Sequence, residues 1–144
     1  MEAMEISRSG LDVEWQRLQV IAQNLANMST TRTATGGVYQ ARRLVSGPAE
    51  GFARVMARYP GQQAAPENGV TVYDVAVAGA GTRTYYDPGH PHADRSGMVT
   101  VPAVSQAEEM TLMMKTTRAY EANLVALAAA QQMYSSALQV GRQA

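Results

Sequence analysis

The residues best suited to chemistry in this sequence lie close together in one Pro-rich segment. His90 and His92 are its only histidines, and Asp87 and Asp94 flank them. Imidazole and carboxylate groups are common ligands of zinc and nickel, so a small metal-binding enzyme using this pair is one hypothesis. Two histidines two positions apart in a turn are more often surface residues. We therefore predict a shaped loop in which Asp94 caps a turn, with no metal ligands.

Two further patterns bear on catalysis. Ser96-Gly97 lacks the Gly-x-Ser-x-Gly context that places a serine nucleophile on a strained turn. Gly79-Ala80-Gly81 has no helix after it and no acidic residue at the distance that a dinucleotide site needs, so a hairpin turn is expected there. The chain also lacks cysteine, and with it a catalytic thiol. We predict no catalytic residues, no cofactor and no small-molecule substrate.

Length and charge narrow the class of protein further. The chain has 144 residues, with 12 basic and 12 acidic side chains, which fits one domain or one short assembly unit. A formal net charge of zero gives no excess basic field for phosphate groups, so nucleic-acid binding and electrostatic membrane anchoring are disfavoured. No apolar run approaches the roughly 18–20 residues of a membrane span, and the first residues lack the pattern of a cleaved secretory signal. We expect no direct membrane insertion.

The first element that must position any site is a helix from Met4 to about Asn27. Asn27 and the Ser29-Thr30-Thr31 cluster favour caps and turns, which ends the helical pattern there. Apolar residues recur along this segment at the spacings of one helix face, namely at Met4, Leu11, Trp15, Leu18, Ala22 and Leu25.

A second helix is predicted from Ser105 to Val140. Ser105 is a suitable N-cap with Glu108 at the capping-box spacing, and Gly141 and Arg142 suit a helix end. Its apolar stripe is typical of a coiled-coil seam and comprises Met113, Thr117, Tyr120, Leu124, Leu127, Gln131, Tyr134 and Leu138.

The segment between the helices holds all six prolines and short alternating runs typical of strands. We predict a mainly α protein with a small β-rich middle, divided into residues 1–30, 31–103 and 104–144. Turns are expected at Pro66–Gly69 and Asp87–Gly89. The predicted strands are Tyr39–Val45, Phe52–Arg58, Val70–Val77, Thr82–Tyr86 and Met98–Val101.

Three runs of residues carry a resemblance to a known family. The first is Ile21–Asn27, followed by Thr30–Thr33 and Gly36–Tyr39. The second is Tyr86–Asp94, followed by Gly97-Met98-Val99 and Pro102, and the third is Arg118-Ala119-Tyr120-Glu121-Ala122-Asn123. With these runs the chain resembles the FlgC family of flagellar basal-body rod proteins, and the alternative within the same class is another rod or hook axial protein.

The resemblance implies a structural, non-enzymatic subunit of the proximal rod, needed for flagellum assembly and swimming. It implies export by the flagellar type III apparatus without a cleaved signal, location in the basal-body rod across the periplasm, and other rod proteins and the chain itself as partners. The two terminal helices would pair as a coiled coil in the wall of the rod. Met4 and Ile6 are the candidates for an export signal. The expected assembly interface comprises Leu11, Trp15, Leu18, Asn24, Leu25, Asn27, Met113, Tyr120, Asn123, Leu124, Leu127, Tyr134 and Leu138.

Overall fold

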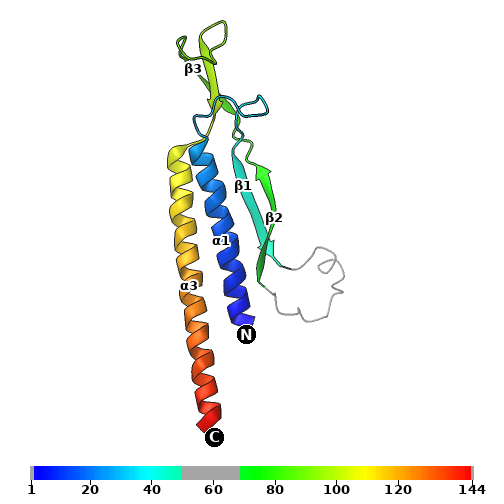
Figure 1. Ribbon diagram of the computed structural model, residues 1–144, viewed down its shortest axis with the longest axis vertical. Helices are drawn as coiled ribbons and strands as arrows, with labels where there is room; N and C mark the ends of the chain where they lie inside the picture. Colours follow the sequence, from blue (N-terminus) through cyan, green and yellow to red (C-terminus); the bar gives the residue numbers. More distant parts are fainter. Residues whose placement is uncertain (1, 50–68, 144) are drawn as a thin grey trace, which may run out of the picture. The chain divides into compact units, whose positions relative to one another are not determined.

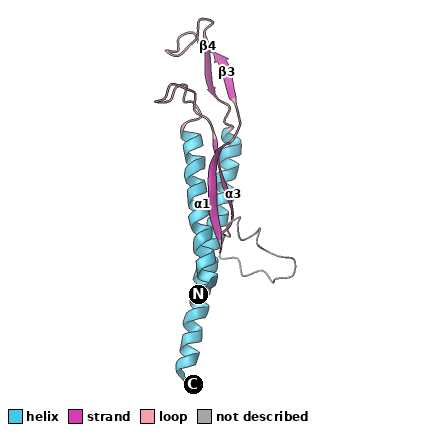
Figure 2. Cartoon of the chain, turned by 90° about the vertical axis from the view of Figure 1, so that its right-hand side faces the viewer, coloured by secondary structure: helices cyan, strands magenta, loops and turns pink. Residues whose placement is uncertain are grey.

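The computed structural model describes residues 2–49 and 69–143. Along the chain, one long helix precedes a small β-rich middle and another follows it, so the predicted mainly α fold with β strands between two helices is confirmed. Figure 2 shows the helices in cyan and the strands in magenta. The elements in chain order are α1 (Glu2–Ala26), β1 (Arg42–Pro48), β2 (Val70–Val77), β3 (Thr82–Tyr86), β4 (Met98–Pro102) and α3 (Gln106–Gln143).

Helix α1 ends where the sequence places a cluster of capping residues. The backbone N–H of Asn27 donates to the carbonyl of Gln23 at 3.0 Å, and the Asn27 side-chain amide donates to the same oxygen at 2.9 Å. The N–H of Thr30 then donates to the carbonyl of Asn27 at 3.0 Å, which closes a turn. The predicted helix end near Asn27 is therefore confirmed, because these groups replace the bonds that a further helical turn would supply.

Helix α3 starts as predicted and ends later than predicted. The Ser105 hydroxyl accepts the N–H of Glu108 at 3.4 Å, and the Ser105 carbonyl accepts the N–H of Glu109 at 3.0 Å, so Ser105 is the N-cap. The helix continues through Gly141 and Arg142 to Gln143, so the predicted stop at this pair is wrong. Gly141 does not adopt the positive φ that a C-terminal glycine cap requires, and it remains helical.

The strands form two separate two-stranded sheets, β1 with β2 and β3 with β4. The β3–β4 pair is antiparallel, with a register from Thr82 opposite Pro102 to Tyr86 opposite Met98. The predicted bounds of β2 and β3 are confirmed, and β4 extends one residue further than predicted.

Strand β1 begins three residues later than the predicted strand, at Arg42 instead of Tyr39. The Tyr39 hydroxyl and the Arg42 N–H both donate to Oδ1 of Asn24. These bonds tie residues 39–42 to α1, and pairing with β2 begins only at Arg42. The predicted strand Phe52–Arg58 and most of the predicted turn at Pro66–Gly69 lie outside the described residues.

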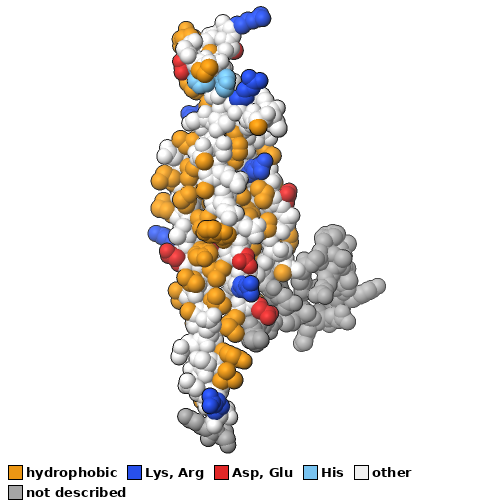
Figure 3. All heavy atoms as spheres, in the orientation of Figure 1, with side chains coloured by type: hydrophobic (Ala, Val, Ile, Leu, Met, Phe, Trp, Pro, Cys, Tyr) orange, Lys and Arg blue, Asp and Glu red, His pale blue; other side chains and the backbone are white. Residues whose placement is uncertain are grey.

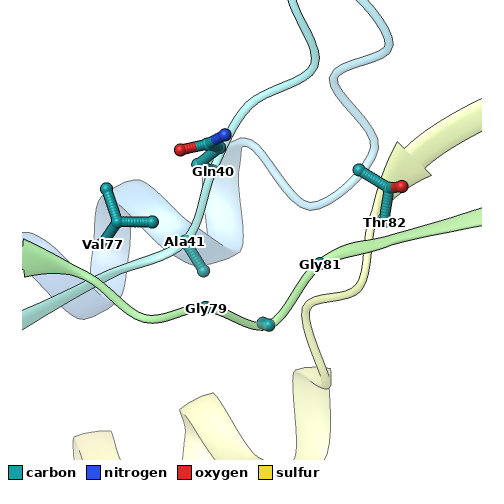
Figure 4. Close-up of a pocket in the computed structure, with 7 residues that line it drawn as sticks. Gln40, Ala41, Val77, Gly79, Gly81 and Thr82 are labelled. Carbon is teal, nitrogen blue, oxygen red and sulfur yellow. The ribbon is translucent and has the colours of Figure 1, made fainter.

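The segment Gly79-Ala80-Gly81 links the two sheets, so the predicted hairpin at this position is wrong. Strands β2 and β3 do not pair, because the N–H of Ala78 donates to Ala41 and the Gly81 carbonyl accepts the N–H of Ala103. Gly79 and Gly81 both have positive φ, at 63° and 69°, which lets the chain turn from one sheet into the next. A pocket of about 190 Å³ lies beside the link, with Gln40, Ala41, Val77 and Thr82 among its lining residues (Figure 4).

The chain forms two compact units. The first comprises residues 1–16, 45–74 and 117–144, and the second comprises residues 17–44 and 75–116. In the first unit, the N-terminal part of α1 (blue in Figure 1) lies beside the orange part of α3, which includes Asn123, and the red C-terminal end of α3 extends beyond α1. The second unit buries apolar side chains from the end of α1, the start of the middle segment and β4, namely Val20, Ile21, Ala41, Val99, Val101 and Pro102.

Gly10 marks a close approach of the two helices in the first unit. A Cβ atom at this position would lie 2.8 Å from Oδ1 of Asn123, whose amide donates to the Ala119 carbonyl at 3.0 Å. The contact involves the far end of a side chain, which can rotate at the cost of that bond. A glycine here costs about 1 kcal/mol of helix propensity relative to alanine, so the close contact with Asn123 accounts for its presence.

Substitutions at Gly10 should therefore separate the effect of helix propensity on stability from the effect of the close contact with Asn123. We expect Gly10→Ala to change the free energy of unfolding by less than about 1 kcal/mol, because the propensity gain offsets the displaced Asn123. Gly10→Leu should lower it by about 1–3 kcal/mol through overpacking. The double variant Gly10→Ala with Asn123→Ala should have a higher free energy of unfolding than Gly10→Ala alone, because it lacks the side chain that the new Cβ atom would meet. Urea unfolding followed by circular dichroism measures all three, and wild-type stability in Gly10→Leu would contradict the close contact.

Candidate functional site

The stripe of α3 that is buried within the chain is small and polar. In the second unit Glu109 is 1% exposed and Thr116 is 3% exposed, and in the first unit Asn123 and Ala130 are half-buried. These four residues follow one another at seven-residue spacing, one position before Thr117, Leu124 and Gln131 of the predicted stripe. In the first unit, the Asn123 side chain fills the space beside Gly10, where even a Cβ atom would lie 2.8 Å from its Oδ1.

The large apolar residues of the predicted seam divide into two groups. Met113, Tyr120 and Leu127 are half-buried. Leu124, Tyr134 and Leu138 are 51%, 46% and 53% exposed. Every residue of α3 from 131 to 142 is exposed, although this stretch carries several large apolar side chains, namely Met133, Tyr134, Leu138 and Val140.

An exposed apolar surface therefore covers the C-terminal part of α3, together with Leu124 and Val125. Figure 3 shows hydrophobic side chains, in orange, at the surface of this part of the helix. Contiguous apolar surface on a folded chain commonly marks a contact with another macromolecule. We call residues 124–140 of α3 with these side chains the α3 apolar surface.

The start of α1 borders a groove in the same unit. Met4, Glu5 and Arg8 of α1 and Leu127 and Gln131 of α3 line an opening of about 250 Å³. Met4 is half-buried there, and Ile6, the second export-signal candidate, is exposed. The structure thus separates these two candidates, since Met4 faces the groove and Ile6 lies on the surface.

The remaining predicted interface residues of α1 differ in exposure. Trp15, in the first unit, is 56% exposed. Leu11, Leu18, Leu25 and Asn27 are half-buried. Trp15 is the large apolar side chain of α1 most available to another molecule among the described residues.

Asn24 lies in the interior of the second unit, and its side chain makes four hydrogen bonds. Its amide nitrogen donates to the carbonyl of Arg42 at 2.9 Å and to Oε2 of Glu109 at 3.2 Å. Its Oδ1 accepts the N–H of Arg42 and the hydroxyl of Tyr39, both at 2.9 Å. Because an amide has two donor hydrogens and an acceptor oxygen with two lone pairs, the side chain is fully satisfied although it is 0% exposed.

Glu109 completes this cluster with an ion pair. Its Oε1 lies 2.5 Å from a guanidinium nitrogen of Arg43, whose side chain is 38% exposed. We call Asn24, Tyr39, Arg42, Arg43 and Glu109 the polar cluster. It joins the end of α1, the start of β1 and the first turn of α3. Sequence analysis identified Asn24 but missed the other four residues. The seven-residue spacing of Glu109, Thr116 and Asn123 is the sequence signal that would have indicated a buried polar line.

Burial raises the pKa of Tyr39 above the ordinary tyrosine value of 10.0. The positive charge of Arg42 lowers this pKa and the negative charge of Glu109 raises it, and burial is the largest of the three effects. The folded chain therefore favours the neutral phenol, which donates to Asn24.

The pH dependence of stability follows from this shift. An ionising group whose pKa is higher in the folded state than in the unfolded state contributes stability below the unfolded value and loses it as pH rises. We expect the free energy of unfolding to fall as pH rises above about 10, and to fall less in Tyr39→Phe. At neutral pH Tyr39→Phe should be about 0.5–1.5 kcal/mol less stable, because Asn24 loses one bond. Urea unfolding of both proteins across this pH range tests the prediction, which fails if their slopes agree.

The histidine segment forms a turn within the second unit. Nδ1 of His90 accepts the backbone N–H of His92 at 3.0 Å, and Nδ1 of His92 lies 2.7 Å from the Thr31 hydroxyl. Oδ1 of Asp94 accepts the N–H of Ser96 at 2.8 Å and of Met98 at 2.9 Å, so the predicted turn cap is confirmed. Within residues 2–49 and 69–143, no three His, Asp or Glu side chains gather as a metal site would require.

The fold and the surface together define a class of protein. Two terminal helices enclose a buried polar line and leave large apolar side chains exposed along α3, as in a subunit that completes its burial in an assembly. In the described parts of the chain, no helix combines the length and the hydropathy of a membrane span.

Comparison with known proteins gives the same class and the family. A family model described as "Flagella basal body rod protein" matches residues 4–32, and one described as "Flagellar basal body rod FlgEFG protein C-terminal" matches residues 95–140. These two matches cover most of α1 and most of α3, and both models describe flagellar rod proteins.

Curated relatives identify the particular family. The flagellar basal-body rod protein FlgC of Escherichia coli is 34% identical over 99% of this chain and 98% of its own length. The FlgC proteins of Borreliella burgdorferi and Bacillus subtilis are each 32% identical, over 96% and 97% of this chain and 95% and 97% of their own lengths. The chain belongs to the FlgC family of flagellar basal-body rod proteins.

Proposed function

We propose that this chain is a structural subunit of the proximal rod of the bacterial flagellar basal body and that it has no enzymatic activity. Membership of the FlgC family supports the rod assignment. The observation that carries the mechanism is the α3 apolar surface, whose last ten residues, 131–140, are all exposed in the isolated chain. In this proposal, neighbouring subunits cover that surface in the rod, and swimming depends on it.

The terminal helices are the parts proposed to polymerise. Residues 1–30 and 104–144 would serve as axial helices that pair as a coiled coil in the rod wall, and residues 31–103 as the β-rich middle. Support comes from the side-by-side helix parts within each unit and from the exposed residues Trp15, Leu124, Tyr134 and Leu138. The half-buried residues of the predicted interface, such as Tyr120 and Leu127, would pack under the exposed residues and hold them in position.

Asn24 has a different place in the proposal. Because its amide is buried and fully bonded within the chain, it would hold the helices together and would not contact a neighbour. Asn123 acts similarly in the first unit, where it fills the space above Gly10.

The proposed partners are other rod proteins, further copies of the chain and the flagellar type III export apparatus. The chain would reach the rod, which crosses the periplasm, without a cleaved secretory signal. Ile6 is the better of the two export-signal candidates in the folded chain because it is exposed, although Met4 would be equally accessible in an unfolded chain passing through the apparatus.

Genetic deletion with complementation tests this function. Loss of the gene should abolish swimming and leave basal bodies truncated at the rod, and the wild-type gene should restore both. Sedimentation of the purified chain with and without other rod proteins should show larger species only in the mixture. Normal swimming and complete basal bodies in the deletion strain would contradict the proposal.

A further inference from the structure

We propose that the polar cluster is a register lock, which fixes one alignment of α3 against α1 among alternatives that differ by seven residues. The proposal rests on the geometry of the cluster and does not depend on assembly into a rod. Its components are the fully bonded Asn24 amide on α1, the Glu109 carboxylate on α3 and the Arg43 guanidinium on β1.

The buried line of α3 is nearly periodic, which makes a slipped alignment sterically possible. Glu109, Thr116, Asn123 and Ala130 repeat every seven residues, and α3 is one continuous helix. A seven-residue slip places Thr116 at Asn24 and Ala130 at Gly10. Alanine is smaller than the Asn123 side chain that lies against Gly10 in the structure, so the close approach would still be accommodated.

Only the native alignment satisfies the polar groups of the cluster. The Glu109 carboxylate supplies two oxygens, one to the amide of Asn24 and one to the guanidinium of Arg43. In the slipped alignment Thr116 would offer a single hydroxyl to Asn24, and Arg43 would lose its ion pair with Glu109. A buried polar side chain that is satisfied in one alignment and not in others is an established means of specifying helix register.

The first turn of α3 is where such a lock has most effect. Glu109 lies four residues after the N-cap Ser105, and β4 ends three residues before that cap. A slip therefore requires the first turns of α3 to unwind, and the bonds of Glu109 hold those turns against α1 and β1. If the proposed function holds, the lock also sets how many residues of α3 extend beyond α1 as exposed surface.

Cysteine cross-linking reports the alignment directly, because the chain has no cysteine of its own. Met4 and Leu127 line the same groove and lie at nearly the same level of the two helices, so Met4→Cys with Leu127→Cys reports the native alignment. Met4→Cys with Tyr134→Cys, seven residues further along α3, reports the slipped one. Each pair is placed in three backgrounds of the full-length chain: wild type, Glu109→Gln, and Glu109→Leu with Arg43→Met.

The proposal predicts a native cross-link alone in the wild type and in Glu109→Gln, because a glutamine oxygen can still accept from Asn24. In Glu109→Leu with Arg43→Met it predicts both cross-links, with helical circular dichroism retained. The native cross-link alone in that apolar variant would overturn the proposal. Loss of the helical signal in the apolar variant would also overturn the proposal, because it would show that the cluster stabilises the fold and does not select the alignment. Equal slippage in Glu109→Gln would overturn it too, because any substitution would then loosen the helices.

Discussion

Replacing Leu138 by aspartate should abolish incorporation of the chain into rods while leaving the isolated chain folded. Leu138 is 53% exposed, so a carboxylate there meets water in the free chain. In an assembly that covers the α3 apolar surface, the same charge would be buried without a partner, which costs several kcal/mol at each subunit contact. Because each subunit carries the substitution, the loss should be complete.

The measurement is swimming and basal-body composition in a deletion strain that carries the variant. Thr71→Asp is the matched control, since it introduces the same charge at an exposed position of β2 in the same unit. We expect no swimming with Leu138→Asp and wild-type swimming with Thr71→Asp. Both proteins should show the circular dichroism of the wild type. Normal rods built from Leu138→Asp would exclude this part of α3 from the interface.

Replacing Asn24 by alanine should cause the largest loss of stability among single substitutions on α1. The change removes four hydrogen bonds and leaves the N–H and carbonyl of Arg42, the hydroxyl of Tyr39 and one oxygen of Glu109 without this partner. Unpaired buried groups each cost about 1–3 kcal/mol. Replacing asparagine by alanine leaves a cavity, and water in it can bond to some of these groups. We therefore expect a total loss of about 3 kcal/mol or more in the free energy of unfolding.

Asn27→Ala is the control for this substitution. Asn27 lies one turn later, is half-buried, and bonds to Gln23 and Thr30 at the end of α1. Its replacement should cost less than about 1 kcal/mol, as loss of a terminal hydrogen bond does. Urea unfolding followed by circular dichroism compares the two variants. Equal losses would show that the bonds of Asn24 contribute no more than an ordinary helix-end contact.

The two helices and two of the strands could be predicted because their signals are local. Ser105 and Glu108 define a capping box within four residues, and the alternation in Val70–Val77 and Thr82–Tyr86 matches strands with the same bounds. The pairing of these strands could not be predicted. The glycines between them suit a hairpin as well as a link, and the outcome depends on Ala41 and Ala103, which are distant in sequence.

The polar cluster shows why only part of the candidate site could be predicted. Hydrophobic periodicity assigns the inward face of a helix to its large apolar residues, and this indicated Leu124 and Tyr134. The structure places Glu109 and Thr116 inward and Leu124 outward. This arrangement requires the partners of Glu109, namely Asn24 and Arg43, which lie 85 and 66 positions earlier in the chain. No pattern within one helix carries that information.

The central claim is that the α3 apolar surface is uncovered in the free chain and covered in the rod. Hydrogen–deuterium exchange of residues 131–140, measured in the purified chain and in isolated basal bodies, tests it most directly. The proposal predicts fast exchange in the free chain, because this stretch makes no buried contact there, and slow exchange in the rod. Slow exchange in the free chain, or equally fast exchange in both states, would contradict the claim.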